Sequence, residues 1–576
     1  MNFSRRSLLV FGGAGMLGAA IPTTLSQLKK TEPTEWIVGE HGGEYGPGTD
    51  ISAAFNNTLL KKGSRPGRVV VPYVNSVMYV DKNSLTIDSD VEIDFYNNHI
   101  KLQNGASKYL LRNETSGNTI SGEIIIKNAT FDGNKRGGQT RRYDQSIKDD
   151  QYGDIYHYKD NYPGFCLVFD RLETLIIENV KIIDPEGWAI AHFLCNTARF
   201  TNVEIMTQNG FGLNGDGITG VATRYVHITN LKGYTNDDMI GISTSRATVQ
   251  GISIFNPRDG RDVESVMVEN LRSLQSQQWW SFVGVGLYFS DEKQIKDINI
   301  DGIEGQFQKH IVRMGDYWSA SSACGIDNVL ISRVYSSTVI PASFDFYFFS
   351  GGVNQFSLIH SKIARRMDSL AGYYNGEENS LLCIEGGKIG AVKINEVDYI
   401  SEFLSLEPER YNRIVLCQNN GEIDQIIFDI HIAADKSNNY CLLSKTHSSD
   451  TATTINVTNL LSNSEMLSFH HITDNPHITI GNVFNVRVSE RLTDNSTITR
   501  VGGDAWIDGA VNLSHGFSQI PSWCAPQQVK IISCYNSAAL QKRYVARINP
   551  DGKVNVLQLP QKVTSVIFDG AGWKCC

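Results

Sequence analysis

Three aspartates in two short polar motifs are the residues whose types and spacing best suit chemistry. Asp216 lies in the motif Asn214–Gly217, and Asp237 and Asp238 lie in Thr235–Asp238, 21 and 22 positions further along the chain. Clustered carboxylates can cleave a sugar–sugar bond, because one protonates the leaving oxygen while another activates water. An adjacent like charge also raises the pKa of a carboxyl and helps to keep it protonated. The two motifs therefore predict a glycosidase site.

The same residue types also form ordinary turns. Asn, Asp and Gly are common turn residues, so both motifs also fit Asx-type turns without a function. Adjacent residues of a strand point to opposite faces, so Asp237 and Asp238 can act together only at a turn or bend. In a parallel β-helix, a spacing near one coil would bring Asp216 to the same face one rung away, about 4.8 Å along the axis. The fold therefore decides between the two interpretations.

A repeated pattern of short strands predicts that fold. The pattern apolar-x-Asn-apolar recurs, and its asparagines at 179, 202, 230 and 270 are 23, 28 and 40 residues apart. Such asparagines tolerate the left-handed conformation and can stack in successive coils. The segment after Asp50 has helical spacing at Ile51, Ala54, Phe55, Leu59 and Leu60, with Asp50 as a plausible N-cap. We expect an all-β chain: a right-handed parallel β-helix with an N-terminal capping helix and C-terminal sandwich-like β modules.

The chain divides into four expected parts. Residues 1–35 form a short docking or twin-arginine-like segment, 36–345 the catalytic β-helix, 346–500 a linker with a β-rich and possible carbohydrate-binding module, and 501–576 a β module for trimerisation or sugar binding. A polar, tyrosine-rich insertion at about 135–162 suits sugar binding. It equally suits packing on a neighbouring subunit.

Composition excludes several classes of protein. The formal charge of −9 and the lack of a Lys/Arg stripe argue against nucleic acid as a partner. The ten cysteines contain no Cys-x-x-Cys pair and no histidines at zinc-ligand spacing, so we expect buried thiols formed in a reducing compartment, with no metal and no cofactor. The apolar run 10–21 is too short and too glycine-rich to span a membrane.

The aspartate motifs resemble the polygalacturonase family, glycoside hydrolase family 28, in which an Asn-x-Asp-Gly motif precedes an Asp-Asp motif by about this interval. The resemblance covers 210–245 on motif and about 40–340 on pattern. It implies an inverting hydrolase without a metal. By matching position, Asp237 would be the general acid, and Asp216 with Asp238 would activate water.

The chain departs from the family at its basic motifs. The Gly-His-Gly segment expected near residue 259 and the Arg-x-Lys segment expected near 286–289 are both missing. These basic residues help to hold galacturonate in the family, so we expect a substrate other than pectin. Arg258 or Arg261 could pair with another acidic sugar. The other candidate substrate-binding residues are Asn214, Trp279, Trp280 and Tyr288; for the aromatic ones, core filling or interface packing is an equal alternative.

The layout of the whole chain resembles a bacteriophage tailspike with capsule-depolymerase activity. This implies an endo-acting glycosidase that cleaves bacterial capsular polysaccharide for host recognition and entry. It also implies a homotrimer in the virion tail, with the N-terminal segment docked on another tail protein. Alternatives are a polygalacturonase-like bacterial enzyme, a non-catalytic glycan-binding adhesin and a polysaccharide lyase. The bacterial enzyme would use the twin-arginine export route, to which 4–9 and the following apolar run are similar.

Overall fold

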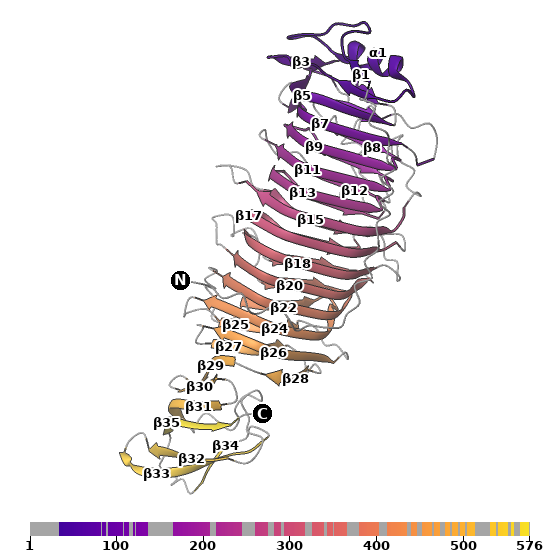
Figure 1. Cartoon of the computed structure of the whole chain (residues 1–576). Helices are drawn as coiled ribbons and strands as arrows, with labels where there is room; N and C mark the ends of the chain where they lie inside the picture. Colours follow the sequence, from indigo (N-terminus) through magenta and orange to yellow (C-terminus); the bar gives the residue numbers. More distant parts are fainter. Residues whose placement is uncertain are drawn as a thin grey trace, which may run out of the picture.

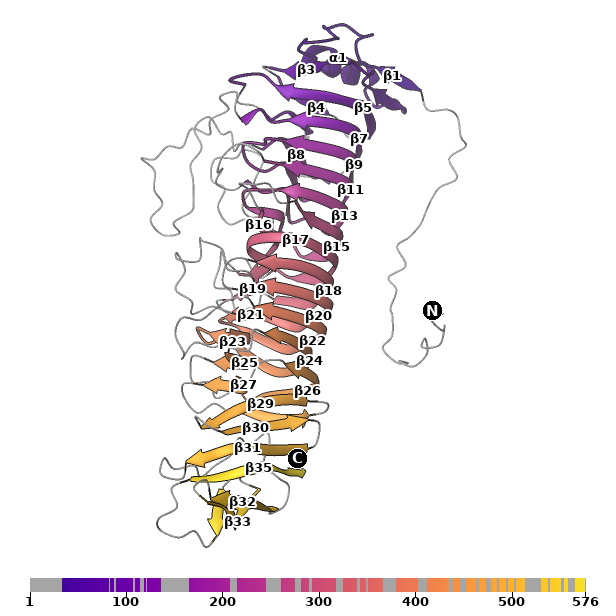
Figure 2. The same ribbon diagram turned by 90° about the vertical axis from the view of Figure 1, so that its left-hand side faces the viewer.

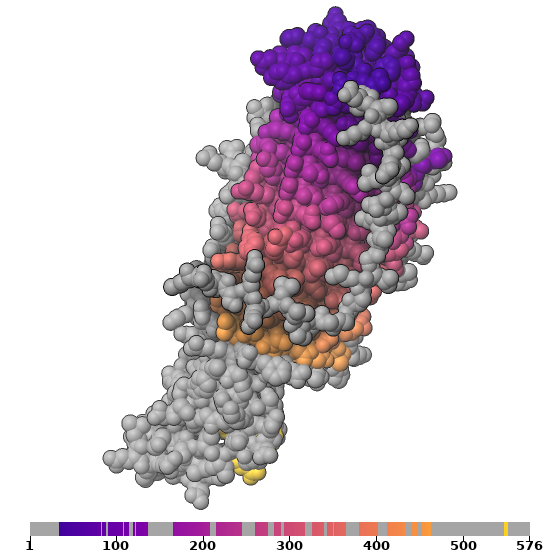
Figure 3. Space-filling model, in the orientation of Figure 1, coloured from indigo at the N-terminus to yellow at the C-terminus, as the bar shows by residue number. Residues whose placement is uncertain are grey.

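The computed structural model describes residues 34–574 with internal gaps. The gaps are 82, 88–89, 107–108, 114–118, 121, 136–164, 208–214, 245–259, 275–280, 290–292, 317–324, 339–341, 349–350, 366–379, 402–411, 435–438, 446–451, 463–465, 473–477, 484–485, 494–495, 502–503, 513–529, 537–538, 551–553 and 558–564. The described strands stack into a long parallel β-helix, with helix α1 at one end and antiparallel strands at the other (Figures 1 and 2). In the space-filling view, the coils form one elongated body (Figure 3). This confirms the predicted fold class.

The first parallel ladder runs along the whole stack. Each strand pairs in parallel with the strand of the next coil, and β3 (Val77–Val80) pairs with the end of β5. Its members are β1 (Glu35–Ile37), β2 (Arg68–Val70), β5 (Val91–Leu102), β7 (Glu123–Asp132), β9 (Thr174–Ile183), β11 (Thr197–Met206), β13 (Tyr225–Tyr234), β15 (Val263–Ser273), β17 (Ile295–Gly315), β18 (Gly325–Thr338), β20 (Gly352–Arg365), β22 (Lys388–Ser401), β24 (Glu422–Ala434), β26 (Thr453–Ser462) and β28 (Ile478–Val483).

The second parallel ladder carries the aspartate motifs. The C-terminal part of β17 belongs to it, between β16 and β19. Its other members are β4 (Leu85–Ile87), β6 (Leu111–Asn113), β8 (Leu167–Asp170), β10 (Ile190–Phe193), β12 (Ile218–Val221), β14 (Asp238–Ser243), β16 (Ser281–Tyr288), β19 (Ala342–Tyr347), β21 (Ser380–Glu385), β23 (Asn412–Gln418), β25 (Asn439–Lys445) and β27 (Met466–Ile472).

The repeated asparagines form the predicted ladder. Asn128, Asn179, Asn202, Asn230 and Asn270 all have φ between 54° and 58°, the left-handed region. From the second to the fifth, each side-chain amide donates to the side-chain oxygen of the asparagine one coil earlier, at 2.9–3.2 Å. These bends let one strand turn a corner of the coil while its hydrogen-bonding groups stay paired.

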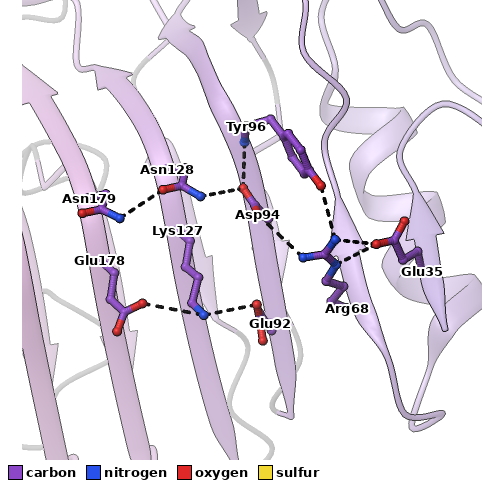
Figure 4. A network of polar contacts seen from close by, with 9 residues as sticks. All are labelled: Glu35, Arg68, Glu92, Asp94, Tyr96, Lys127, Asn128, Glu178 and Asn179. Carbon is purple, nitrogen blue, oxygen red and sulfur yellow. Dashed lines mark hydrogen bonds and ion pairs between the residues drawn. The ribbon is translucent and has the colours of Figure 1, made fainter. Parts of the chain in front are cut away.

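The ladder ends in a polar network over the first coils (Figure 4). The Asn128 amide donates to Asp94 at 3.0 Å, and Arg68 links Asp94 to Glu35. In the same view, Lys127 lies between Glu92 and Glu178, which belong to the coils on either side. Opposite charges thus alternate between coils on this outer face. Each such surface pair contributes little to stability, so the buried interior remains the main source.

Parallel coils continue well beyond the boundary expected near residue 345. β19 pairs in parallel with β21, and parallel pairing persists to β27 and β28, so the stack includes most of 346–483. The corner position is still left-handed after Asn270, but it is occupied by Gly302, Arg333, His360 and Glu396. The loss of asparagine, rather than a change of fold, therefore made the sequence pattern loosen.

The chain ends in antiparallel strands, as expected for the C-terminal module. They pair from β29 onwards, and β31 and β32 both pair with β35. The strands are β29 (Val486–Thr493), β30 (Ser496–Val501), β31 (Asp504–Asn512), β32 (Lys530–Asn536), β33 (Ala539–Ile548), β34 (Val554–Leu557) and β35 (Ser565–Lys574).

Helix α1 (Ser52–Lys62) lies over the first coil, as predicted (Figure 1). Its Phe55 ring stacks on Phe95 of β5 at 6.0 Å, which extends the apolar interior to the end of the stack. Two details differ from expectation. The N-cap position is held by Ile51, with the Asp50 carboxylate accepting from the Ser52 N–H at 2.9 Å, and Leu60 is exposed to solvent.

Buried cysteines are part of the coil interior. Cys166, Cys195, Cys383, Cys417 and Cys441 are all buried and form no disulfide, as expected for these five. Burial raises the pKa of Cys195 and of Cys417 to about 12, so both are thiols at neutral pH. Within the described ranges, no helix is long and apolar enough to cross a membrane.

Candidate active site

Asp216 and Asp238 occupy the same position in adjacent coils. Ile218 of β12 pairs with Ile240 of β14, and each aspartate lies two residues before its isoleucine. The Gly217 N–H donates to the Asp238 carbonyl at 2.8 Å, so pairing extends to the aspartates themselves. The predicted one-coil relation between the two motifs is therefore present.

Asp237 lies in a bend directly before β14. The Thr235 hydroxyl donates to the Asp237 carbonyl at 2.8 Å and closes this bend. Asp237 is half-buried, whereas Asp216 and Asp238 are buried. Because the pair lies at a bend, strand alternation does not force Asp237 and Asp238 onto opposite faces. The condition for the two adjacent carboxylates to act together is met.

Glycines leave room for the carboxylates on the outer face of the second ladder. Gly241 pairs with Thr219 on one side and with Gly286 on the other. A Cβ on Gly241 would lie 3.4 Å from Asp216 Oδ2 and 3.6 Å from Asp238 Oδ2. The side chains of both aspartates therefore lie over a glycine, and Thr219 donates to Asp216 Oδ2 at 2.9 Å.

Burial and crowding of charge control the proton at Asp238. Burial, followed by the Asp237 and Asp216 carboxylates, raises the pKa of Asp238 well above its usual range. The Tyr288 hydroxyl, which donates to Asp238 Oδ2 at 2.6 Å, and the positive charge of Arg313 oppose this shift only in part. The cluster thus favours a proton on Asp238 over one on an ordinary, solvent-exposed aspartate.

Of the other predicted substrate-binding residues, the structure describes Tyr288 and Arg261. Tyr288 does join the site, through its hydrogen bond to Asp238. Arg261 donates to the backbone carbonyls of Cys195 and Ala222 and to Asn196 Oδ1, which gives it a structural role between coils. Its role in binding substrate stays a prediction. Asn214, Arg258, Trp279, Trp280 and most of the tyrosine-rich insertion lie outside the described residues.

Sequence reasoning missed Arg313 and the glycines. Gly286 pairs with Arg313, so the arginine occupies the same position on the outer face as Gly241 and Gly286, two coils from Gly241. The coil between Asp238 and its partner Val283 is 45 residues long, about twice the coil before it. Counting at the shorter period therefore does not locate Gly286 or Arg313, and no local motif marks them.

Gly286 offers a direct test of the geometry. A Cβ there would lie 2.2 Å from Asp238 Oδ2 and 2.4 Å from the Tyr288 hydroxyl oxygen, so Gly286→Ala must displace both side chains. We expect a loss of about 100-fold in glycosidase activity, the size that follows a displacement near 1 Å in an active site. Gly241→Ala is the matched control, because its Cβ would meet only ordinary contacts, and we expect a loss below tenfold. Initial rates and circular dichroism of both variants check this; equal activities would contradict it.

Fold and site together define a parallel β-helix protein with a carboxylate cluster on an outer face. The family model described as "Glycosyl hydrolases family 28" matches residues 63–271, which include all three aspartates. The match supports a glycoside hydrolase with a family 28-like β-helix.

Several solved structures are similar to the chain at low identity. The family 28 exopolygalacturonase of Yersinia enterocolitica is 12% identical, with a TM-score of 0.41, and the match covers 78% of this chain and 79% of that one. The surface adhesin PfbA of Streptococcus pneumoniae is 12% identical, with a TM-score of 0.45, over 72% and 93%. Endo-xylogalacturonan hydrolase of Aspergillus tubingensis is 13% identical, with a TM-score of 0.34, over 77% and 100%. No curated protein sequence matches the chain.

Proposed function

We propose that the protein is an inverting, endo-acting glycosidase that hydrolyses a bacterial capsular polysaccharide. The observation that carries this proposal is the cluster of Asp216, Asp237 and Asp238, in which burial and the other two carboxylates raise the pKa of Asp238. Inverting hydrolysis needs one protonated carboxyl for the leaving oxygen and one ionised carboxylate for water. A cluster that holds one proton among several carboxyls has both forms at once.

The raised pKa of Asp238 suggests which aspartate acts as the general acid. The family resemblance gives the acid role to Asp237, whereas burial and neighbouring charges favour Asp238 as the proton holder. In the proposed mechanism, Asp238 donates its proton to the leaving oxygen as the glycosidic bond breaks. Asp216 and Asp237 remain ionised and remove a proton from the attacking water, whose oxygen bonds to the anomeric carbon.

The proposed biological setting is the tail of a bacteriophage, with the chain as a trimeric tailspike. The order of parts supports it: a capping helix, a long stack of coils and an antiparallel C-terminal module (Figure 2). The N-terminal segment would dock on another tail protein. The molar mass of the purified protein in solution tests the assembly, since a trimer of this 64.0 kDa chain has three times that mass.

The proposed activity is tested on a panel of purified capsular polysaccharides. We expect oligosaccharides of repeat-unit size, each carrying one added water per broken bond, and we expect them to disappear in Asp216→Asn. Asp301→Asn is the matched control, because Asp301 pairs with Arg333 on the first ladder, outside the carboxylate cluster. Products that lack the added water and absorb in the ultraviolet would indicate a lyase instead. Saturable binding with intact polymer across the panel would indicate an adhesin.

A further inference from the structure

A second polar cluster lies on the same outer face, further along the stack from the aspartates. One oxygen of Asp345, the sulfur of Cys383 and one oxygen of Glu385 all lie within 4.8 Å of one another. Asp345 of β19 pairs directly with Cys383 of β21, and Glu385 lies two residues after Cys383 and therefore on the same face. Asp345 also pairs with Arg313. Gly241, Gly286, Arg313 and Asp345 therefore occupy the same position in successive coils.

His310 supplies an independent sign that the cluster takes a cation. Its Nδ1 lies 2.8 Å from the carbonyl oxygen of Ala342, which can only accept, so Nδ1 carries the hydrogen. Nε2 has no hydrogen-bond partner among the described residues, and the side chain is 2% exposed. This nitrogen lies 3.5 Å from Asp345 Oδ2.

His310 Nε2 and Asp345 Oδ2 therefore face each other in a buried place. A neutral imidazole nitrogen and a carboxylate oxygen repel each other unless a proton or a cation lies between them. A separation of 3.5 Å also suits two ligands of one tetrahedral metal ion, whose bonds are about 2.0–2.2 Å.

Charge and surroundings favour a divalent ion. Two carboxylates, with the thiolate that Cys383 becomes when it binds a metal ion, carry three negative charges, and the Arg313 guanidinium, whose Nε lies 3.3 Å from Asp345 Oδ2, offsets one of them. The remaining two match a divalent cation. Ala342, Cys383 and Leu416 form a small apolar cluster beside these groups, which lowers the local dielectric and strengthens metal–ligand attraction.

We propose that Asp345, Cys383 and Glu385, with His310 at their edge, bind a divalent transition-metal ion of the Zn²⁺ type. Sulfur, nitrogen and carboxylate oxygen are the donors that Zn²⁺ uses in proteins, whereas Ca²⁺ and Mg²⁺ take oxygen. The chain was expected to bind no metal, since no short motif marks this site and its ligands come from three coils. The metal site does not depend on the proposed glycosidase activity.

The test uses the full-length protein loaded with Zn²⁺ or Co²⁺ and freed of excess metal by gel filtration. We expect about one metal ion per chain and, with Co²⁺, the absorption band of sulfur-to-cobalt charge transfer. Cys383→Ser should abolish that band and weaken Zn²⁺ binding at least tenfold. Cys417→Ser is the matched control: Cys417 is also buried on a neighbouring coil but faces the interior, so its substitution should change neither.

A second variant keeps the test decisive if Cys383→Ser does not fold. Glu385→Gln preserves size and the thiol, and we expect it to keep its thermal transition without metal but to bind Zn²⁺ at least tenfold more weakly in titration calorimetry. A wild-type protein that retains no metal would overturn the proposal. Wild-type affinity in Glu385→Gln, or a sulfur-to-cobalt band that persists in Cys383→Ser, would do the same.

Discussion

Asp238→Asn is expected to abolish measurable depolymerisation and, at neutral pH, to make the protein more stable. Loss of a group that transfers the proton lowers the rate about 10²- to 10⁴-fold. The amide has nearly the size of the carboxyl and can still accept from the Tyr288 hydroxyl, which now lies 2.6 Å from Asp238 Oδ2. We therefore expect the fold around β14 to be preserved.

The stability gain follows from the direction of the pKa shift. The folded-state pKa of Asp238 is raised, so between the ordinary aspartate pKa, about 3.9, and the raised value the folded protein holds a proton that the unfolded chain has released. The free energy of unfolding then falls by about 1.4 kcal/mol for each pH unit in this window. Asparagine removes this dependence. The difference in melting temperature between Asp238→Asn and wild type should be small near pH 4 and should grow towards pH 7.

Asp301→Asn is a control with the opposite sign. Arg333 lowers the pKa of Asp301, so that carboxylate stabilises the fold above its ordinary pKa, and its loss should slightly lower the melting temperature at pH 7. Activity should be unchanged, since Asp301 lies on the first ladder. A pH-independent melting difference between wild type and Asp238→Asn would contradict the protonated Asp238.

The main features of the fold were predictable because they repeat. The left-handed corner selects asparagine in five coils, and that pattern revealed the stack. The same corner accepts glycine, arginine, histidine and glutamate further on, since stacking and strand pairing on both sides hold the backbone in place. The asparagine pattern therefore ends at Asn270, although parallel pairing continues past the boundary expected near residue 345.

The site was predictable where it is local in sequence. Asp216, Asp237 and Asp238 lie in two motifs one short coil apart, so counting residues was enough to bring them together. Gly286 and Arg313 reach the same face from coils separated by longer and unequal loops. Their positions depend on register, which single-sequence counting does not determine when coil length varies.

Rates on a substrate with a good leaving group should distinguish the roles of Asp237 and Asp238. General-acid catalysis matters most when the leaving group is a poor one, because a good leaving group departs without a proton. We expect Asp238→Asn to recover at least about tenfold of its lost rate on a repeat-unit oligosaccharide that carries dinitrophenol at its reducing end. Asp237→Asn should be impaired to a similar degree on both substrates, because an ionised Asp237 acts on water rather than on the leaving oxygen.

Rates of the two variants on the polymer and on the dinitrophenyl substrate, measured across pH, check this assignment. For wild type we expect the rate on the polymer to fall as pH rises through the raised pKa of Asp238, because the proton donor is then lost. On the dinitrophenyl substrate this fall should be weaker, because no proton is needed for departure. Recovery in Asp237→Asn instead of Asp238→Asn would return the acid role to Asp237, as the family resemblance implies. Asp238 would then serve in positioning the attacking water, and its proton would have to leave before each reaction.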